Sequence, residues 1–239
     1  MTYGPAEMMA VAMARCLRDG EVVFHGVSSI LPMLAIHVAR RTHAPRLVHL
    51  NIGGGVGTEP EVLPKSSCDP ALLRGTAAIV DNVDFYQFVM RGGIDATFLG
   101  FVQMDAAGRT NSSVLGDPTR PRVRLPGGGG AAVILPTAKR VIMWRTQHTA
   151  RVFVETLDFV TATGNVDRVV TPLGVMARRD RRLQVEQVFP YATVEEIRRN
   201  TGFALPDGPE PAGAPPPTAA ELAAIASLDP ERARDLEFK

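Results

Sequence analysis

The residues His49 to Pro60, HLNIGGGVGTEP, place four glycines inside a loop that follows an apolar stretch: Gly53, Gly54, Gly55 and Gly57. Glycine permits positive φ angles and close backbone approach, so such a loop can aim peptide N–H groups at an anion or at a carbonyl oxygen gaining charge. The loop carries no Ser, Cys, Lys, Asp or Glu before Glu59, and no GK[ST] follows as in a P-loop. The plainer interpretation is a tight turn that lets neighbouring elements pack.

A second glycine cluster lies in RVRLPGGGGAAV, residues 122–133, again beside an apolar segment. Two such loops in one α/β domain suggest a single site built from both. The segment between them carries a string of polar residues: Gln103, Asp105, Asn111 and Ser112. Gln103 is flanked by apolar residues at a strand end and is the best ligand contact among them. For Asp105 and Ser113 the plainer interpretation is an Asx or Ser turn that caps local backbone.

Helical and extended patterns alternate along the first half of the chain. Helices are expected over residues 5–17, 28–43 and 81–93, and strands over 21–27, 47–53 and 94–104. Residues 131–138 and 140–147 continue the pattern, and short β-rich pieces follow at 153–161, 169–179 and 183–190. This alternation predicts βαβ units and a parallel sheet. Because ligands bind beyond the carboxyl ends of such strands, the first glycine loop is in a favoured position.

Composition limits the class of protein. The 239 residues are 45% hydrophobic, enough for one large α/β domain or two small ones. Twenty-six basic against 25 acidic residues provide no broad field for nucleic acid or an anionic membrane. Cys16 and Cys68 have no metal-ligand spacing, and no signal-peptide or membrane-span pattern occurs, so we expect a cytoplasmic protein without a metal site.

The C-terminal part of the chain differs in composition from the rest. From Leu205 the sequence LPDGPEPAGAPPPTAAEL is too rich in proline and glycine for a core and predicts an extended arm. Thr218 followed by Glu221 forms a capping-box pattern that predicts a short helix near the end. We therefore expect an α/β domain over residues 1–204 and a proline-rich arm with a short helix over residues 205–239.

Several segments together resemble the β subunit of class I coenzyme A transferases, nearest to the β subunit of the glutaconate CoA-transferase type. They run in order as LPKSSCDPALL, DFYQFVMRGGIDATFLGFVQMDAAGRTNSSVLGD, VRLPGGGGAA, AKRVIM, RVFVETLDFVT and TVEEIRRNTGF, across residues 5–205. The resemblance implies an open, mostly parallel α/β sheet with flanking helices and an acyl-CoA substrate. It also implies an α subunit as partner, in a heterodimer or heterotetramer with the active site at the subunit interface. The arm would then wrap a neighbouring subunit.

The resemblance also assigns roles to residues. In true transferases a glutamate of the first loop attacks the acyl-CoA and forms an anhydride and then a glutamyl-CoA thioester. Ungapped alignment puts that glutamate on Ile52, and a shift of one residue puts it on Asn51; neither side chain can attack. The family's GxGGA motif matches Gly127, Gly129, Gly130 and Ala131, whose amides would serve as oxyanion donors. The substrate pocket would be lined by Gly53, Gly54, Gly55, Gln103, Tyr86 and Cys68.

Other candidates have plainer interpretations beside the functional ones. Cys68 could line the pocket or be an inert buried cysteine. His25 and His148 could return a proton, or be ordinary core or loop histidines. Tyr86 could reach the acyl group, or help Phe85 pack its helix against the sheet. The cluster RRDRR, Arg178 to Arg182, could be a solvated turn, or could meet the CoA phosphates or the partner subunit.

A protein with oxyanion donors but no nucleophile can still run reactions that pass through a thioester enolate. Decarboxylation of a glutaconyl-type thioester needs no cofactor, because the electrons delocalise onto the thioester oxygen; one preorganised donor contributes about 3 kcal/mol. Ile52 in place of glutamate removes a competing nucleophile and a like charge. The family includes members without the glutamate that decarboxylate 3-methylglutaconyl-CoA, and others that hydrolyse steroid-derived rings. The closer similarity to the glutaconate type favours the decarboxylase, which forms 3,3-dimethylacrylyl-CoA.

Two alternatives stay open. One is a CoA transferase or thioester hydrolase whose glutamate comes from the partner subunit or from another loop position, although Glu59 and Glu61 lie far along the loop. The other is a non-catalytic subunit that completes and stabilises an active partner.

Overall fold

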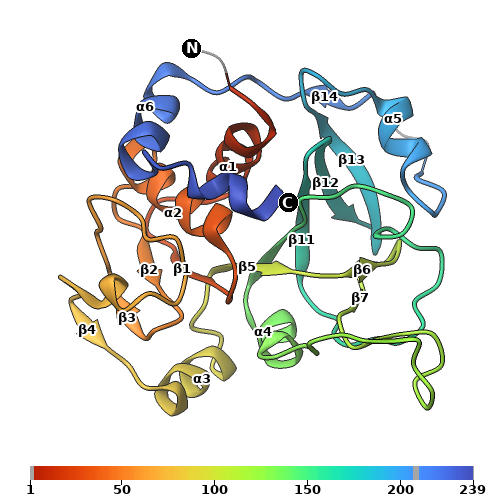
Figure 1. Cartoon of the computed structure of the whole chain (residues 1–239), viewed down its shortest axis with the longest axis horizontal. Helices are drawn as coiled ribbons and strands as arrows, with labels where there is room; N and C mark the ends of the chain where they lie inside the picture. The colour runs from red at the N-terminus through yellow and green to blue at the C-terminus, as the bar shows by residue number, and fades with distance from the viewer. Residues whose placement is uncertain (1–2, 207–209, 239) are drawn as a thin grey trace. The chain divides into compact units, whose positions relative to one another are not determined.

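The computed structural model describes residues 3–206 and 210–238. The chain divides into two compact units, traced in Figure 1. The first unit comprises residues 1–99, 138–142 and 216–239, and the second comprises residues 100–137 and 143–215. The division proposed from composition, with a boundary after residue 204, remains a prediction.

The first unit has a parallel sheet at its centre. Strand β1 (Val22–His25) lies between β2 (Val48–Leu50) and β5 (Ala96–Gly100) and runs parallel to both. The edge beyond β2 is antiparallel and consists of β3 (Gly55–Val56) and β4 (Ala78–Ile79). Beyond β5 the sheet continues into β10 (Arg140–Trp144). Val23 and Phe24 of β1 are buried, as expected for a central strand of a parallel sheet covered by helices.

Helices surround this part of the sheet. They are α1 (Pro5–Arg15), α2 (Ile30–Thr42), α3 (Asn82–Met90) and α6 (Ala219–Leu228), with 3₁₀ turns η1 (Pro70–Leu73) and η2 (Ala233–Phe238). In α1, Pro5 occupies the first turn and the Glu7 side chain accepts a bond from the Gly4 amide at 2.8 Å. Residues 6–14 are all buried; they are apolar except for Glu7, which forms an ion pair with Arg234 at 2.8 Å. The sequence of α1 therefore forms core rather than surface.

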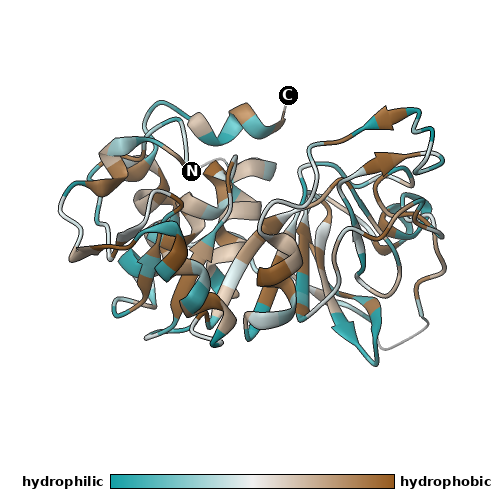
Figure 2. Cartoon of the chain, turned by 90° about the horizontal axis from the view of Figure 1, so that it is seen from below, coloured by the Kyte–Doolittle hydropathy of each residue, from teal (hydrophilic) through white to brown (hydrophobic). Residues whose placement is uncertain are grey.

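The second unit is built mainly from antiparallel strands. Strands β11 (Val166–Thr171), β12 (Gly174–Arg179) and β13 (Arg182–Val188) form a meander, and β14 (Ala212–Gly213) is parallel to β13. Two short hairpins pair β6 (Gln103–Met104) with β7 (Thr110–Asn111), and β8 (Val114–Leu115) with β9 (Val123–Arg124). The unit also contains α4 (Ala131–Thr137) and α5 (Val194–Arg199). Residues 179–182, at the β12–β13 turn, are charged and exposed. Figure 2 shows the distribution of hydrophobic and hydrophilic residues along the chain.

The expected α/β architecture with flanking helices is confirmed. The predicted helix near the C-terminus is α6, and the Thr218 and Glu221 side chains form the expected capping box. The expected strand at residues 153–161 is wrong: the segment forms no strand, and its one bridge pairs Phe153 with Met104. Its apolar residues serve the core instead, since Phe153 is fully buried. Within the described residues, no helix is long and apolar enough to cross a membrane.

Candidate functional site

The first glycine loop is a tight reversal between β2 and β3. Leu50 pairs with Val56, and the Asn51 amide donates to the Gly55 carbonyl at 3.0 Å. Gly54 has φ of +89°, and a Cβ there would lie 2.1 Å from the Val80 carbonyl oxygen. The loop therefore needs glycine to turn the chain and to let β4 approach, as the plainer interpretation of the sequence stated.

Asn51 holds this loop together from inside. Its Oδ1 accepts bonds from the amides of Gly53 and Gly55, each at 3.0 Å. Its Nδ2 donates to Thr58 Oγ1 and to the Leu72 carbonyl, each at 2.8 Å. The side chain is only 2% exposed, and all four of its hydrogen-bonding positions are satisfied. Asn51 is therefore a structural residue of the loop, and Ile52 is the half-buried side chain that follows it.

The expectation that this loop aims its amides at an anion is wrong. The Gly53 and Gly55 amides bond Asn51 Oδ1, and the Gly54 amide donates to the Asn51 carbonyl at 3.0 Å. The Gly57 amide donates to the His49 carbonyl at 2.8 Å. Because each amide already has an acceptor, Gly53, Gly54 and Gly55 can contact a ligand by van der Waals packing but not donate a hydrogen bond to it. Their place in a substrate pocket remains a prediction.

The nearest carboxylate of the loop is engaged elsewhere. Glu59 forms an ion pair with Arg40 of α2, and its side chain is 75% exposed. Arg40 also donates to the Thr58 carbonyl at 2.6 Å, and Arg41 donates to the carbonyls of Pro60 and Glu61. These bonds tie residues 58–61 to α2. Glu59 is therefore held in a surface ion pair rather than free to act as a nucleophile.

In the second glycine cluster, unlike the first, some backbone amides have no hydrogen-bond acceptor among the described residues. The Gly127 amide donates to the Ser112 carbonyl at 2.7 Å, so the expected donor role of Gly127 is wrong. Among the described residues, the amides of Gly129 and Gly130 have no acceptor within the protein. Gly129 has φ of +50°, and a Cβ there would meet nothing within 4 Å. Two of the three predicted oxyanion donors are thus available to a ligand.

The polar string before this cluster mostly caps local backbone. Asp105 is buried, accepts bonds from the Ala107 and Arg109 amides, and pairs with the Arg109 side chain at 2.6 Å. Asn111 likewise accepts from the Ser113 amide at 3.0 Å. Gln103 is half-buried, and its Oε1 accepts a bond from Asn111 Nδ2 at 3.0 Å. The Asx-turn interpretation is confirmed for Asp105. The Ser-turn interpretation of Ser113 is wrong, because its Oγ lies 2.7 Å from Thr161 Oγ1 instead of bonding local backbone. The ligand role of Gln103 remains a prediction.

The remaining candidates divide between packing and surface positions. Phe85 is buried and packs against Phe24 at a ring-centroid distance of 4.7 Å, while half-buried Tyr86 lies edge-on to Phe85. Phe85 therefore packs α3 onto the sheet, as its plainer interpretation stated. Cys68 is exposed, so the inert buried interpretation is wrong. The cluster from Arg178 to Arg182 spans the β12–β13 turn, with positive φ at Asp180 and Arg181.

The two histidines considered as proton donors are buried and neutral. His25 Nδ1 lies 2.8 Å from Ser29 Oγ, and burial lowers the His25 pKa to about 4. His148 bonds Thr171 Oγ1 at 2.8 Å and Thr201 Oγ1 at 3.0 Å, and burial lowers its pKa to about 4. Both rings are uncharged near pH 7. This geometry favours the core interpretation over proton transfer.

Sequence reasoning missed a cluster of three histidines in the first unit. His49 lies between His25 and His37, with ring-centroid distances of 4.9 and 5.0 Å. Burial lowers the pKa of His37 to about 3 and that of His49 well below its usual value, and neither His49 ring nitrogen has a partner. No group of three metal-binding side chains in the described part of the chain could hold a metal ion. The regular helical and strand spacing of these residues gave no signal that they meet.

Comparisons with known proteins agree on one family. The sequence matches the family described as coenzyme A transferase over residues 6–200. It is 34% identical to the β subunit of 3-oxoadipate CoA-transferase from Pseudomonas knackmussii, covering 95% of this chain and 94% of that one. It is 29% identical to the β subunit of glutaconate CoA-transferase from Acidaminococcus fermentans, covering 85% and 84%. The solved structure of the decarboxylase AibA/AibB superposes with a TM-score of 0.93 at 32% identity, covering 99% of both chains.

Proposed function

The chain belongs to the coenzyme A transferase family, and from that premise we propose that it is the β subunit of an enzyme that decarboxylates a glutaconyl-type acyl-CoA. The reaction would need no cofactor, and coenzyme A would take part only as the substrate's thioester. Similarity to the decarboxylase AibA/AibB supports this proposal. AibA/AibB is named as a pair and the other relatives are named as subunits, which supports an α subunit as partner. A cytoplasmic location remains our expectation.

One observation carries the proposal: the first glycine loop has no side chain that can attack a thioester. All four hydrogen-bonding positions of the Asn51 side chain are occupied within the protein, and Ile52 is apolar. Glu59 is paired with Arg40. A transferase of this family needs a carboxylate nucleophile, so its defining intermediate has no group here to form on.

Decarboxylation needs other properties, which these residues can supply. The bond between the distal carboxylate and the adjacent carbon breaks, and its electron pair spreads through the double bond onto the thioester oxygen. The free amides of Gly129 and Gly130 would stabilise that oxygen, and one such donor typically contributes about 3 kcal/mol. Ile52 would present an apolar surface without a competing charge. Carbon dioxide leaves, and a proton returns to the carbon skeleton.

The proposal is tested by co-expressing the chain with its α subunit. 3-Methylglutaconyl-CoA and glutaconyl-CoA are followed by mass spectrometry, with and without acetate as CoA acceptor. Loss of one CO2 with the thioester retained is the expected result. Formation of acetyl-CoA would instead establish transferase chemistry.

A glycine variant tests the oxyanion role in the same assay. Gly129→Val should lower kcat at least about tenfold, because the added side chain crowds the free amides. Gly20→Val is the matched control, since Gly20 also has positive φ, at +81°, and open surroundings. Unchanged turnover in an intact Gly129→Val complex would leave this chain only a scaffold role.

Transferase activity is the second candidate, favoured by the 34% identity to a component of 3-oxoadipate CoA-transferase. It requires a glutamate from the partner subunit. Trapping an enzyme-bound thioester with hydroxylamine or borohydride would support it and contradict the decarboxylase.

A further inference from the structure

Arg145 differs from the other half-buried arginines in having no partner for its charge. Each of the others bonds a carboxylate or a carbonyl oxygen: Arg15, Arg40, Arg140, Arg168 and Arg178. Among the described residues, no carboxylate lies within 4.0 Å of the Arg145 guanidinium, and its buried Nε has no acceptor. An unpaired and partly desolvated cation therefore lies in the second unit.

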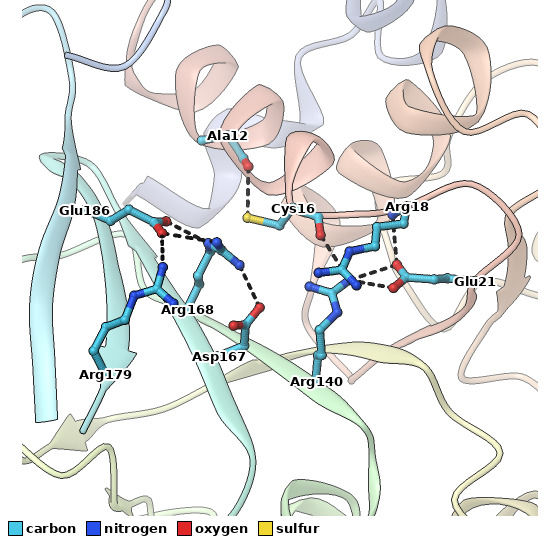
Figure 3. Close-up of polar contacts among 9 residues, drawn as sticks. All are labelled: Ala12, Cys16, Arg18, Glu21, Arg140, Asp167, Arg168, Arg179 and Glu186. Carbon is cyan, nitrogen blue, oxygen red and sulfur yellow. Dashed lines mark hydrogen bonds and ion pairs between the residues drawn. The ribbon is translucent and has the colours of Figure 1, made fainter. Parts of the chain in front are cut away.

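Figure 3 shows how arginines elsewhere in the chain are satisfied. Arg140, the first residue of β10, donates to both carboxylate oxygens of Glu21 at 2.7 and 2.9 Å. Arg168 of β11 bonds Glu186 through Nε at 2.7 Å and Asp167 at 2.7 Å. The protein thus supplies carboxylates to comparable guanidinium groups and leaves Arg145 without one.

This arrangement costs free energy that an anion would recover. Burial lowers the pKa of Arg145, yet a guanidinium keeps its charge at neutral pH. A charge taken out of water without a counter-ion is unfavourable, and an anionic ligand would supply the missing acceptors. The planar guanidinium matches a carboxylate in a bidentate geometry.

The position of Arg145 suits a ligand contact. The amides of Lys139 and Arg140 donate to the carbonyls of Ile94 and Asp95, so β10 and β5 begin at the same edge of the sheet and run in the same direction. Arg145 directly follows the last residue of β10, and its own amide donates to the Val170 carbonyl at 3.1 Å. It therefore lies at the carboxyl end of its strand on a fixed backbone, where α/β proteins bind ligands.

We propose that Arg145 binds the free carboxylate of a dicarboxylic acyl-CoA. This inference rests on the proposed function, which requires a substrate with a carboxylate at the end opposite the thioester. Because the pair forms in the ground state, Arg145 determines affinity and specificity more than the rate of the chemical step.

The test compares two thioesters that cannot decarboxylate through a conjugated system. Glutaryl-CoA carries a free carboxylate, and butyryl-CoA has the same CoA phosphates without one. Their dissociation constants are measured by calorimetry on the complex of this chain with its α subunit. Because no turnover is needed, the result is independent of whether the complex decarboxylates anything.

Arg145→Gln should weaken glutaryl-CoA about 10- to 100-fold and leave butyryl-CoA within about twofold. Arg145→Lys should restore part of the loss, since it keeps the charge but not the bidentate geometry. Arg151→Gln is the matched control, an exposed arginine of the same unit whose side chain makes no hydrogen bond or ion pair with the described residues, and it should change the affinity for neither ligand. Equal weakening of both thioesters, or no change in either, overturns the assignment; unchanged butyryl-CoA binding also shows that the variant is folded.

Discussion

The sequence could not show whether Asn51 is a site residue or a structural support of the loop. Its alignment with a lost glutamate suggested a site position, but its four hydrogen bonds make it the internal support of the loop. Thr58 and Leu72 lie 7 and 21 residues away in the chain, so their convergence on one amide follows only from the fold. The assignment of the lost glutamate's position to Ile52 remains a prediction.

Replacing Asn51 should destabilise the protein strongly. Asn51→Ala leaves the Gly53 and Gly55 amides without an acceptor and removes one bond each from Thr58 and Leu72, which still bond each other. Unfolding should therefore become easier by about 3 kcal/mol. Urea denaturation measures the difference. Asn82→Ala is the control, because Asn82 is exposed and has no side-chain hydrogen bond in the described structure, and it should change stability by less than about 0.5 kcal/mol. Equal stability of the two variants would show that the loop does not depend on Asn51.

The histidine cluster predicts sensitivity to acid. The folded-state pKa of His25 is lowered to about 4 and that of His37 to about 3, below the usual 6.5, so these rings take up protons on unfolding. Their contribution to stability is complete above pH 6.5 and is lost as the pH falls toward 4.

His37→Leu tests this directly. Each neutral buried histidine adds about 1.4 kcal/mol per pH unit to the slope of the unfolding free energy against pH between pH 6.5 and 4.5. The slope should therefore be smaller by this amount in the variant. Urea denaturation at several pH values gives the slope. His43→Leu is the control, since His43 is exposed and outside the cluster, and the wild-type slope should persist. A His37→Leu slope equal to that of the wild type would contradict the buried neutral state.

At the scale of elements, helices α1, α2, α3 and α6 were predicted from the sequence, whereas α4, α5 and part of the β structure were not. Helical spacing and the proline at its start located α1, and the capping box located α6. Residues 153–161 have the composition of a strand, yet they supply side chains such as Phe153 to the core and make only one isolated bridge. Whether a β-branched segment finds a partner strand depends on distant residues, which local propensity does not contain.

Gly54 in the β2–β3 loop and Gly57 after β3 should differ in their tolerance of a methyl group. Gly54→Ala combines a positive φ with a Cβ only 2.1 Å from the Val80 carbonyl oxygen, so β4 must move and stability should fall by several kcal/mol, roughly 3 or more. Gly57→Ala is the matched control: it also has positive φ, at +71°, but its nearest atom would be 3.9 Å away. It should cost only about 1 kcal/mol. Thermal unfolding of both variants ranks them, and the reverse order would show that β4 does not pack as described.

At the scale of the whole chain, η2 near the C-terminal end belongs to the first unit and contacts the start of α2. Glu237 of η2 accepts bonds from the amides of Ile30 and Leu31, at 2.8 and 3.0 Å, where α2 begins. Ser29, the residue before α2, has no side-chain capping bond to the helix, so a residue 207 positions away caps this helix. Sequence alone could not show this, because the Pro-rich composition after Leu205 predicted an arm and gave no docking site.

Glu237 makes this contact dependent on pH, in the direction opposite to the histidines. Burial raises the Glu237 pKa from 4.5 to about 7, so the folded state holds the proton more tightly than the unfolded chain. Its stabilising contribution is complete below pH 4.5 and is lost as the pH rises through 7. Glu237→Gln stays neutral, so its stability relative to the wild type should improve between pH 5 and 8, by on the order of 2 kcal/mol.

Hydrogen exchange of residues 229–238 in the wild type and Glu237→Gln at both pH values measures the docking itself. The wild-type segment should exchange faster at pH 8 than the intrinsic rate change explains, and the variant should not. Glu231→Gln serves as the control, because Lys65 lowers the Glu231 pKa and the carboxylate stays charged across this range. If Glu237→Gln leaves the difference in exchange between the two pH values unchanged, the Glu237 carboxylate remains ionised when docked. The amides at the start of α2 would then stabilise its charge.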